Sequence, residues 1–426
     1  MSLSERQQQQ VDAIASLVTQ RDQSAVRQGI ELAVALGDQE VFAALLDGMA
    51  FDSPVQIPGD RLPNHRRYPT PERAKIFEAG TGEQALLDLA MLHLLAASEH
   101  PLRTRVTSIA LGTPQRKFAR PAPILWIEGL ERLTALTHLD LHLTKNDEGL
   151  DVSSLEHFPE LRYLRVRGAV LPGAIPAMQH LKAINGVRLE FAPDAHFPAL
   201  ESVRGQFPQG GPLSRNSMPK LVDVEARNGV RLVGFESLRN LWCYRGDVQM
   251  IGCRRVDHLR LSGATVDAPD LRQVELLDRI SAGFDVAQLE SLGAVKMSQT
   301  SKFNGGRFPK GTRLADPQVS LWGPELADLG NIGELPGLRI LLMPRVRLPL
   351  SLEPLRSATE LRVLDIRFSP GITDLTPLIG LPNLEVLVID RPDAKEIPPE
   401  LADRVVKTWR NGRRSRRGPK HLTGKA

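Results

Sequence analysis

The feature that most restricts the fold of this chain is a short apolar string that recurs along most of its length. Each of the five clearest copies has an apolar residue, then proline, then a variable residue and a second apolar residue, with another apolar residue three positions further on. These copies begin at Phe158, Phe197, Met218, Leu335 and Leu381. One such segment cannot bury its own apolar face, but stacked copies can share a continuous core. The repeat therefore predicts a solenoid.

Within each repeat, the spacing of the apolar residues predicts one short strand per coil. Copies without proline fill the gaps, and the last three strings, at Leu338, Leu361 and Leu384, lie 23 residues apart. Successive strand residues point to opposite faces, so an LxxLxL string turns its leucines inward and the residues around them outward. Stacked coils are expected to form a parallel sheet. Near residue 181 two registers fit equally well, Leu181/Ile184/Gly186 and Ile184/Val187/Leu189.

The first hundred residues show helical periodicity instead. Val11, Ile14 and Val18 recur at helical spacing, and Gly37-Asp38 supplies a helix end and an N-cap for the next helix. Residues 83–97 are apolar on nearly all sides, which predicts a helix packed on both flanks, whereas the proline-rich stretch 51–70 predicts a loop. Because the open end of a solenoid exposes core and unpaired strand edge, we expect the helical region to cap the first coil.

These patterns predict three regions. We expect an α-helical N-terminal cap domain over residues 1–105 and a repeat solenoid over 106–401 with an irregular insertion at about 297–321. Residues 402–426 are expected to form a C-terminal cap helix and a basic disordered tail. From Arg404 onward the chain has nine basic residues and no acidic one, while its formal net charge is only +4, so residues 1–403 are net acidic. A block of like charges with glycine and proline buries little apolar surface.

Residues 124–401 resemble leucine-rich repeat proteins, and the string GITDLTPLIGLPNL from Gly371 to Leu384 is similar to the short repeats of bacterial internalins. The resemblance implies an α/β fold, a leucine-rich repeat solenoid with a curved parallel sheet, preceded by the α-helical domain. One consensus feature is missing, since the asparagine that follows each strand is replaced by residues such as Ala169, Ser369 and Pro392. The turns are therefore expected to satisfy their backbone groups in another way.

The outward strand positions predict a binding surface on the concave face that this resemblance implies. They combine arginine with aromatic side chains, a mixture typical of protein interfaces, although the chain has only 3 Tyr and 4 Trp. The candidate partner-binding residues are Tyr163, Arg165, Arg167, Arg204, Arg227, Trp242, Tyr244, His258 and Arg260. The arginines suit an acidic or phosphate-bearing protein partner. The alternative is that single aromatic rings only pack on the stems of their neighbours.

Sequence motifs for catalysis are absent. GxxxxGK[ST], GxSxG, HExxH and GxGxxG do not occur. His138 and His142 flank Asp140 on one strand face, which favours solvated histidines over metal ligands. Cys243 and Cys253 fall within the solenoid and are expected to be core residues or partly exposed thiols rather than nucleophiles. We therefore expect a protein that is not an enzyme and has no cofactor and no metal.

Two functional hypotheses remain open. The first is a non-catalytic protein–protein interaction module, that is, a scaffold, adaptor or inhibitor-type binder. The second is a nucleic-acid-associated protein anchored by the basic tail, through Arg410, Arg413, Arg414, Arg416, Arg417 and Lys420. The sequence has no run of 18 apolar residues and no apolar signal-peptide core, so we expect a cytoplasmic protein without membrane attachment.

Overall fold

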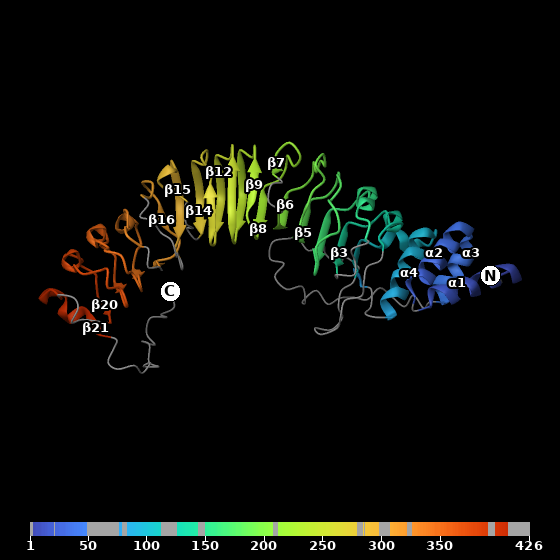
Figure 1. Cartoon of the computed structure of the whole chain (residues 1–426), viewed down its shortest axis with the longest axis horizontal. Coiled ribbons are helices and arrows are strands. Elements are labelled where there is room, and N and C mark those ends of the chain that lie inside the picture. The colour runs from blue at the N-terminus through green and yellow to red at the C-terminus, as the bar shows by residue number, and fades with distance from the viewer. Residues whose placement is uncertain are drawn as a thin grey trace. The chain divides into compact units, whose positions relative to one another are not determined.

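The computed structural model describes residues 3–20, 22–48, 76–78, 83–111, 126–143, 150–207, 212–278, 284, 286–297, 307–321, 326–390 and 397–407. The chain divides into two compact units, Met1–Phe235 and Glu236–Ala426. Both units consist mainly of stacked parallel strands, with about 11 turns of parallel β-solenoid in all (Figure 1). The predicted solenoid with parallel strands is confirmed at this level.

Four α-helices occur in the described part of the first unit. They are α1 (Glu5–Val18), α2 (Gln23–Leu36), α3 (Gln39–Gly48) and α4 (Glu83–Ala97), followed by the 3-10 helix η2 (Pro101–Arg105). Gly37 ends α2 in the left-handed region, with a φ of 63°. The Asp38 carboxylate then accepts hydrogen bonds from the backbone N–H groups of Glu40 and Val41, at 2.9 and 3.3 Å, and caps α3 as predicted. Residues 89–96 of α4 are all buried. These helices fit the expected α-helical cap.

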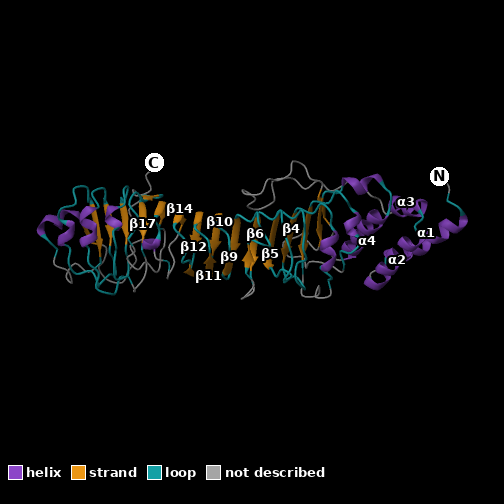
Figure 2. Ribbon diagram, turned by 90° about the horizontal axis from the view of Figure 1, so that it is seen from above, coloured by secondary structure: helices purple, strands orange, loops and turns teal. Residues whose placement is uncertain are grey.

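The main sheet of the first unit is parallel throughout its described strands. In spatial order it contains β1 (Ile76–Glu78), β2 (Ser108–Leu111), β3 (His138–His142), β4 (Tyr163–Arg167), β5 (Ala183–Arg188), β6 (Ser202–Gln206) and β8 (Asp223–Ala226). A second, shorter parallel pair joins β7 (Leu213–Ser214) to β9 (Val230–Val233). Figure 2 shows the helices on one end of this unit and the strands stacked side by side beyond them.

The second unit repeats this arrangement with two main groups of strands. The first group contains β10 (Ser237–Cys243), β12 (Arg255–Leu261), β14 (Gln273–Asp278), β15 (Ser291–Lys296) and β16 (Arg313–Leu314), accompanied by a pair of β11 (Gly246–Ile251) and β13 (Ala264–Asp267). The second group contains β17 (Gln318–Ser320), β18 (Ile340–Leu342), β19 (Val363–Asp365), β20 (Val386–Ile389) and β21 (Val405–Lys407).

The coil length differs between these two groups. Ser237, Arg255, Gln273 and Ser291 are direct partners in neighbouring strands, so the three coils from β10 to β15 are each 18 residues long. In the second group Ile340 pairs with Val363 and Val363 with Val386, which gives the 23-residue coil that the sequence predicts. In the first group, the coils after β10 and β12 carry the strands β11 and β13 on a second side, and the coil after β14 carries the 3-10 helix η5 (Val286–Gln288). The two 23-residue coils carry the 3-10 helices η7 (Glu353–Ser357) and η8 (Thr376–Leu378).

Most predicted inward positions are buried. Leu338, Leu361 and Leu384 are at most 3% exposed. One correction concerns β14, where the LxxLxL spacing that starts at Leu271 predicts Leu276 as a core residue. Leu277 is fully buried there and Leu276 is half-buried, so the string reads LxxVxxL. Around residue 181 the first register prevails, because Ile184 pairs with Leu164 of β4.

In this register, the Leu189 side chain fills the core beside β5 and β6. The third inward position of β5 and of β6 is glycine, at Gly186 and Gly205. A Cβ atom at Gly186 would lie 2.4 Å from Leu189 Cδ2, and one at Gly205 would lie 2.9 Å from Leu189 Cδ1. The Leu189 side chain, which has no exposed surface, therefore occupies the space of two missing side chains.

The turns replace the missing asparagine with other side chains. The buried Ser369 hydroxyl donates a hydrogen bond to the backbone carbonyl of Met343 at 2.7 Å and accepts one from Val346 N at 3.0 Å. Asn331 plays a related role, since its amide accepts from Phe308 N at 2.7 Å and donates to the Phe308 carbonyl at 3.1 Å. As expected, the turns satisfy their backbone groups without the consensus asparagine: a serine hydroxyl does so in one coil, and an amide from a different position does so in another.

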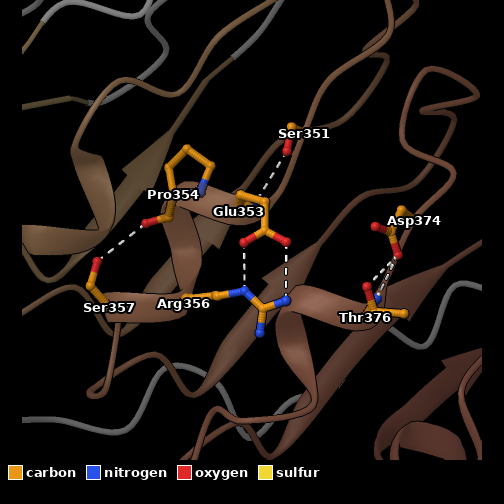
Figure 3. A network of polar contacts seen from close by, with 7 residues as sticks. All are labelled: Ser351, Glu353, Pro354, Arg356, Ser357, Asp374 and Thr376. Atoms are coloured by element: carbon orange, nitrogen blue, oxygen red, sulfur yellow. Dashed lines mark hydrogen bonds and ion pairs between the residues drawn. The ribbon is translucent and has the colours of Figure 1, made fainter.

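Several coils contain a short 3-10 helix in the segment that connects one strand to the next. These helices are η3 (Leu130–Arg132), η4 (Ser153–His157), η5 (Val286–Gln288), η6 (Ile332–Glu334), η7 (Glu353–Ser357), η8 (Thr376–Leu378) and η10 (Pro399–Arg404). Ser351 and Asp374, which lie 23 residues apart, each accept a hydrogen bond from the backbone N–H two residues later, at the start of η7 and η8 (Figure 3). Both side chains therefore satisfy backbone groups at the start of these helices.

Two expected segments differ from the structure. In the stretch 297–321, β16 and β17 pair with neighbouring strands, so its described part beyond residue 306 belongs to the solenoid, while residues 298–306 lie outside the described residues. The C-terminal cap helix is replaced by η10 and by β21, which adds a strand beside β20 because Val405 and its neighbours can extend the sheet. The basic tail from residue 408 and the loop 51–70 also lie outside the described residues.

Candidate recognition surfaces

The predicted partner-binding residues fall in both units. Tyr163, Arg165, Arg167, Arg204 and Arg227 belong to the first unit, and Trp242, Tyr244, His258 and Arg260 belong to the second. Arg227 and His258 are exposed and the other seven are half-buried. We call the outward side chains of β3, β4, β5, β6 and β8 the first-unit face, and those of β10, β12, β14 and β15 the second-unit face.

Asp140 organises one end of the first-unit face. Arg167 donates to both of its carboxylate oxygens, with Nε to Oδ1 at 3.1 Å and Nη2 to Oδ2 at 2.7 Å. Arg165, which lies opposite Asp140 in the neighbouring strand, has its Nη1 atom 4.0 Å from Oδ2. A single carboxylate thus fixes two guanidinium groups, which leaves this end of the face positively charged.

The other end of the first-unit face is closed by a second ion pair. Arg204 and Glu225 are direct partners in register, with Arg204 Nη2 3.1 Å from Glu225 Oε1. Between the two ion pairs stands Asn185 of β5, which pairs with Arg165 on one side and with Arg204 on the other. The register then shifts, so that Arg188 comes to lie opposite Gln206 of β6.

Histidine and tyrosine rings lie beside the arginines. The His138 ring stacks on the Tyr163 ring, with centroids 4.3 Å apart and planes at 17°. Burial lowers the pKa of His138 below its usual 6.5, and the charge of Arg162 lowers it further. Burial, followed by the charge of Arg167, also lowers the pKa of His142. Both histidines are therefore neutral at pH 7.

The second-unit face is built around Arg260. Its guanidinium lies over the Trp242 ring, 5.6 Å from the centroid, and its Nε atom is 3.7 Å from Asp278 Oδ2. The three residues are consecutive partners across β10, β12 and β14. Asn240 and His258 are direct partners two residues earlier on β10 and β12, and Asn240 Oδ1 lies 3.1 Å from His258 Nδ1. Arg260 is thus held by a ring on one side and a carboxylate on the other, with its side chain 29% exposed.

Groups that could support catalysis do not gather on either face. Of the two expected settings for Cys243 and Cys253, the structure shows the buried one. Burial raises the pKa of Cys253 to about 11, so that its thiol stays protonated at pH 7. Among the described residues, no three His, Cys, Asp or Glu side chains lie close enough to hold a metal ion. In the same part of the chain, no helix has the length and apolar character needed to cross a bilayer.

Sequence reasoning missed two residues of the first-unit face, Asn185 and Arg188. The signal was present, because aligning Ile184 with Leu164 places Asn185 outward. The competing register around Val187 hid it, and the register shift that turns Arg188 toward Gln206 leaves no mark in the sequence.

No protein-family model matches this chain, and no curated protein matches it either.

Proposed function

We propose that the chain is a non-catalytic interaction module of the leucine-rich repeat type, a scaffold, adaptor or inhibitor-type binder that recognises another protein through its sheet faces. The observation that carries this proposal is the arrangement of Trp242, Arg260 and Asp278, in which a half-buried aromatic ring and a carboxylate fix an arginine at the surface. Tryptophan, tyrosine and arginine dominate the binding energy of protein interfaces, and they contribute most when they are fixed before binding.

The first-unit face supports the same function. Tyr163 is stacked on His138, and Arg167 is held by two hydrogen bonds to Asp140, so these side chains lose little conformational freedom when a partner binds. The strands β3, β4, β5 and β6 are each paired on both sides within the sheet, which makes the platform rigid. A rigid, polar and arginine-rich face suits a protein partner with an acidic surface.

Site-specific photo-crosslinking tests this proposal. A photoreactive phenylalanine analogue replaces Tyr163 or Trp242 on the faces, and in control chains it replaces Arg231 of β9 or Ile251 of β11, which are exposed on other strands. In extracts of the native cell, we expect discrete cross-linked protein species from the two face positions and none from the two controls. Cross-links of equal yield at all four positions, or at none, would reject the proposal.

A nucleic-acid-associated role remains the second candidate. It rests on the sequence from Arg404 onward, where nine basic residues occur without an acidic one. Such an arm gains affinity by releasing counterions from phosphates, which makes binding steeply salt-dependent and insensitive to sequence. Removing residues 408–426 is expected to abolish retention on nucleic acid and to leave the face cross-links unchanged. Retention that survives this truncation would count against the second candidate.

A further inference from the structure

The centre of the first-unit face is a row of three hydrogen-bond donors with a carboxylate at each end. Across β3, β4, β5, β6 and β8, each residue of the row is the direct partner of the next, in the order Asp140, Arg165, Asn185, Arg204 and Glu225. Neighbouring strands lie about 4.8 Å apart, so the backbones that carry Arg165 and Arg204 are about 10 Å apart. The Asn185 amide stands between them.

Both arginines are anchored from their outer sides. Arg165 has Asp140 at 4.0 Å and Arg204 has Glu225 at 3.1 Å, while the two arginine side chains are 30% and 37% exposed. Their Nε atoms are buried, so the exposed surface belongs to other atoms of these side chains. A ligand that arrives above Asn185 therefore meets guanidinium groups that are already positioned.

Arg188 adds a third guanidinium to this position. It lies opposite Gln206 in the adjacent row, next to Asn185 and Arg204, and it is exposed. Neither β5 nor β6 contains an acidic residue. Carboxylates that can balance the positive charge above Asn185 therefore come from the neighbouring strands, Asp140 on β3 and Asp223 and Glu225 on β8.

We propose that Arg165, Asn185, Arg188 and Arg204 bind the phosphate group of a phosphorylated segment in the partner protein. The proposal rests on the protein-binding function above and specifies its partner. A phosphoryl group carries nearly two negative charges at pH 7 and three acceptor oxygens, so it can engage several guanidinium groups at once. A carboxylate has one charge and two oxygens, so it offers this cluster less charge and fewer acceptor atoms than a phosphoryl group does.

Binding to matched peptide libraries tests this proposal on the full chain. The probes are fluorescent peptides with random flanks and a fixed central phosphoserine, and the same libraries with serine or glutamate at that position. We expect the phosphoserine library to bind at least ten-fold more tightly than the other two. Arg188→Ala and Arg204→Ala are each expected to weaken this binding at least five-fold. Lys220→Ala and Arg231→Ala, which remove exposed charges outside the cluster, are expected to change it less than two-fold.

Four results would overturn the proposal. They are equal affinity for the glutamate library, no measurable preference for phosphoserine, equal losses in the two control variants, and stronger competition by single-stranded RNA than by phosphopeptide at equal charge. Phosphatase treatment separates this proposal from the broader function. A partner that cross-links at position 163 and binds equally well after dephosphorylation would overturn phosphate recognition alone, whereas a chain without face-specific cross-links would reject the function itself.

Discussion

His93 lies on α4 with its side chain 4% exposed and its ring 5.2 Å from the ring of Trp126. Burial lowers its pKa from 6.5 to about 3; a hydrogen bond with the Trp126 backbone opposes this shift and the charge of Arg27 adds to it. Arg27 in turn lies over the Trp126 ring, 5.9 Å from its centroid. The contact between the helices and the first coil therefore depends on a neutral histidine.

We expect this histidine to make the first unit sensitive to acid. The folded chain disfavours the protonated ring, so the stability contributed by neutral His93 is complete above about pH 6.5 and is lost as the pH falls toward 3. At pH 5 the loss amounts to about 2 kcal/mol. The measurement is the thermal unfolding midpoint at pH 7 and pH 5. His93→Gln should reduce the pH-dependent shift and His157→Gln, at an exposed position, should not; identical shifts in all three chains would contradict the assignment.

Ser369 provides a second prediction for a single residue. Its hydroxyl is the partner of both Met343 O and Val346 N in a buried turn, so Ser369→Ala leaves two backbone groups without a partner. We expect this change to lower the free energy of unfolding by about 1–3 kcal/mol. Ser357→Ala, at an exposed hydroxyl, should cost less than about 0.5 kcal/mol. Urea titration monitored by circular dichroism measures both, and equal midpoints would show that the Ser369 hydroxyl is dispensable.

Among the structural elements, β5 and β6 depend on glycine. A Cβ atom at Gly205 would lie 2.8 Å from the carbonyl oxygen of Gly186 and 2.9 Å from Leu189 Cδ1. Because a backbone atom cannot move aside cheaply, Gly205→Ala is expected to destabilise the first unit by roughly 1–3 kcal/mol.

The matched control for this substitution is Gly380→Ala. A Cβ atom at Gly380 would have no neighbour within 4 Å, so this variant should unfold at the temperature of the unchanged chain or slightly above it. Differential scanning calorimetry compares the two variants. A Gly205→Ala chain as stable as the control would mean that Leu189 and the Gly186 backbone can rearrange.

The strands that could be predicted from the sequence are those with the LxxLxL spacing. The 23-residue coils through Leu338, Leu361 and Leu384 have strong apolar periodicity, and α4 is apolar on nearly all sides over a length typical of a helix. The second-side strands β9, β11 and β13 were not foreseen, because they are only four to six residues long and lie outside the LxxLxL strings. In β14 the choice of Leu277 over Leu276 depends on how neighbouring coils pack, which no local spacing encodes.

The candidate faces were only partly predictable for a related reason. Alternation within one strand shows which residues point outward, and it correctly places Tyr163, Arg165 and Trp242 at the surface. The contacts that fix these residues join different strands, such as Arg167 with Asp140 and Arg260 with Trp242. Those pairs depend on the register between coils of unequal length, and a shift of one residue would exchange every partner.

For the whole molecule, the architecture explains why function is expected at the surface. Each coil contributes a few inward residues to a shared core and a few outward residues to a face, so the outward residues can change without loss of the fold. The buried core is mainly apolar along the described coils, with a few buried polar residues such as Ser369 and Asp365, whereas the faces carry arginine, aromatic and carboxylate side chains in contact. Recognition by these faces is the central claim.

The affinity of the partner that cross-links at position 242, measured by calorimetry with purified chains, tests this claim most directly. We predict that Trp242→Ala and Arg260→Ala each cost about 2 kcal/mol of binding free energy, a roughly 30-fold loss, because they remove a fixed aromatic ring and its arginine. Ile251→Ala, at an exposed position on β11, should leave the affinity within two-fold. Unchanged binding in both face variants, with folding intact, would contradict the account.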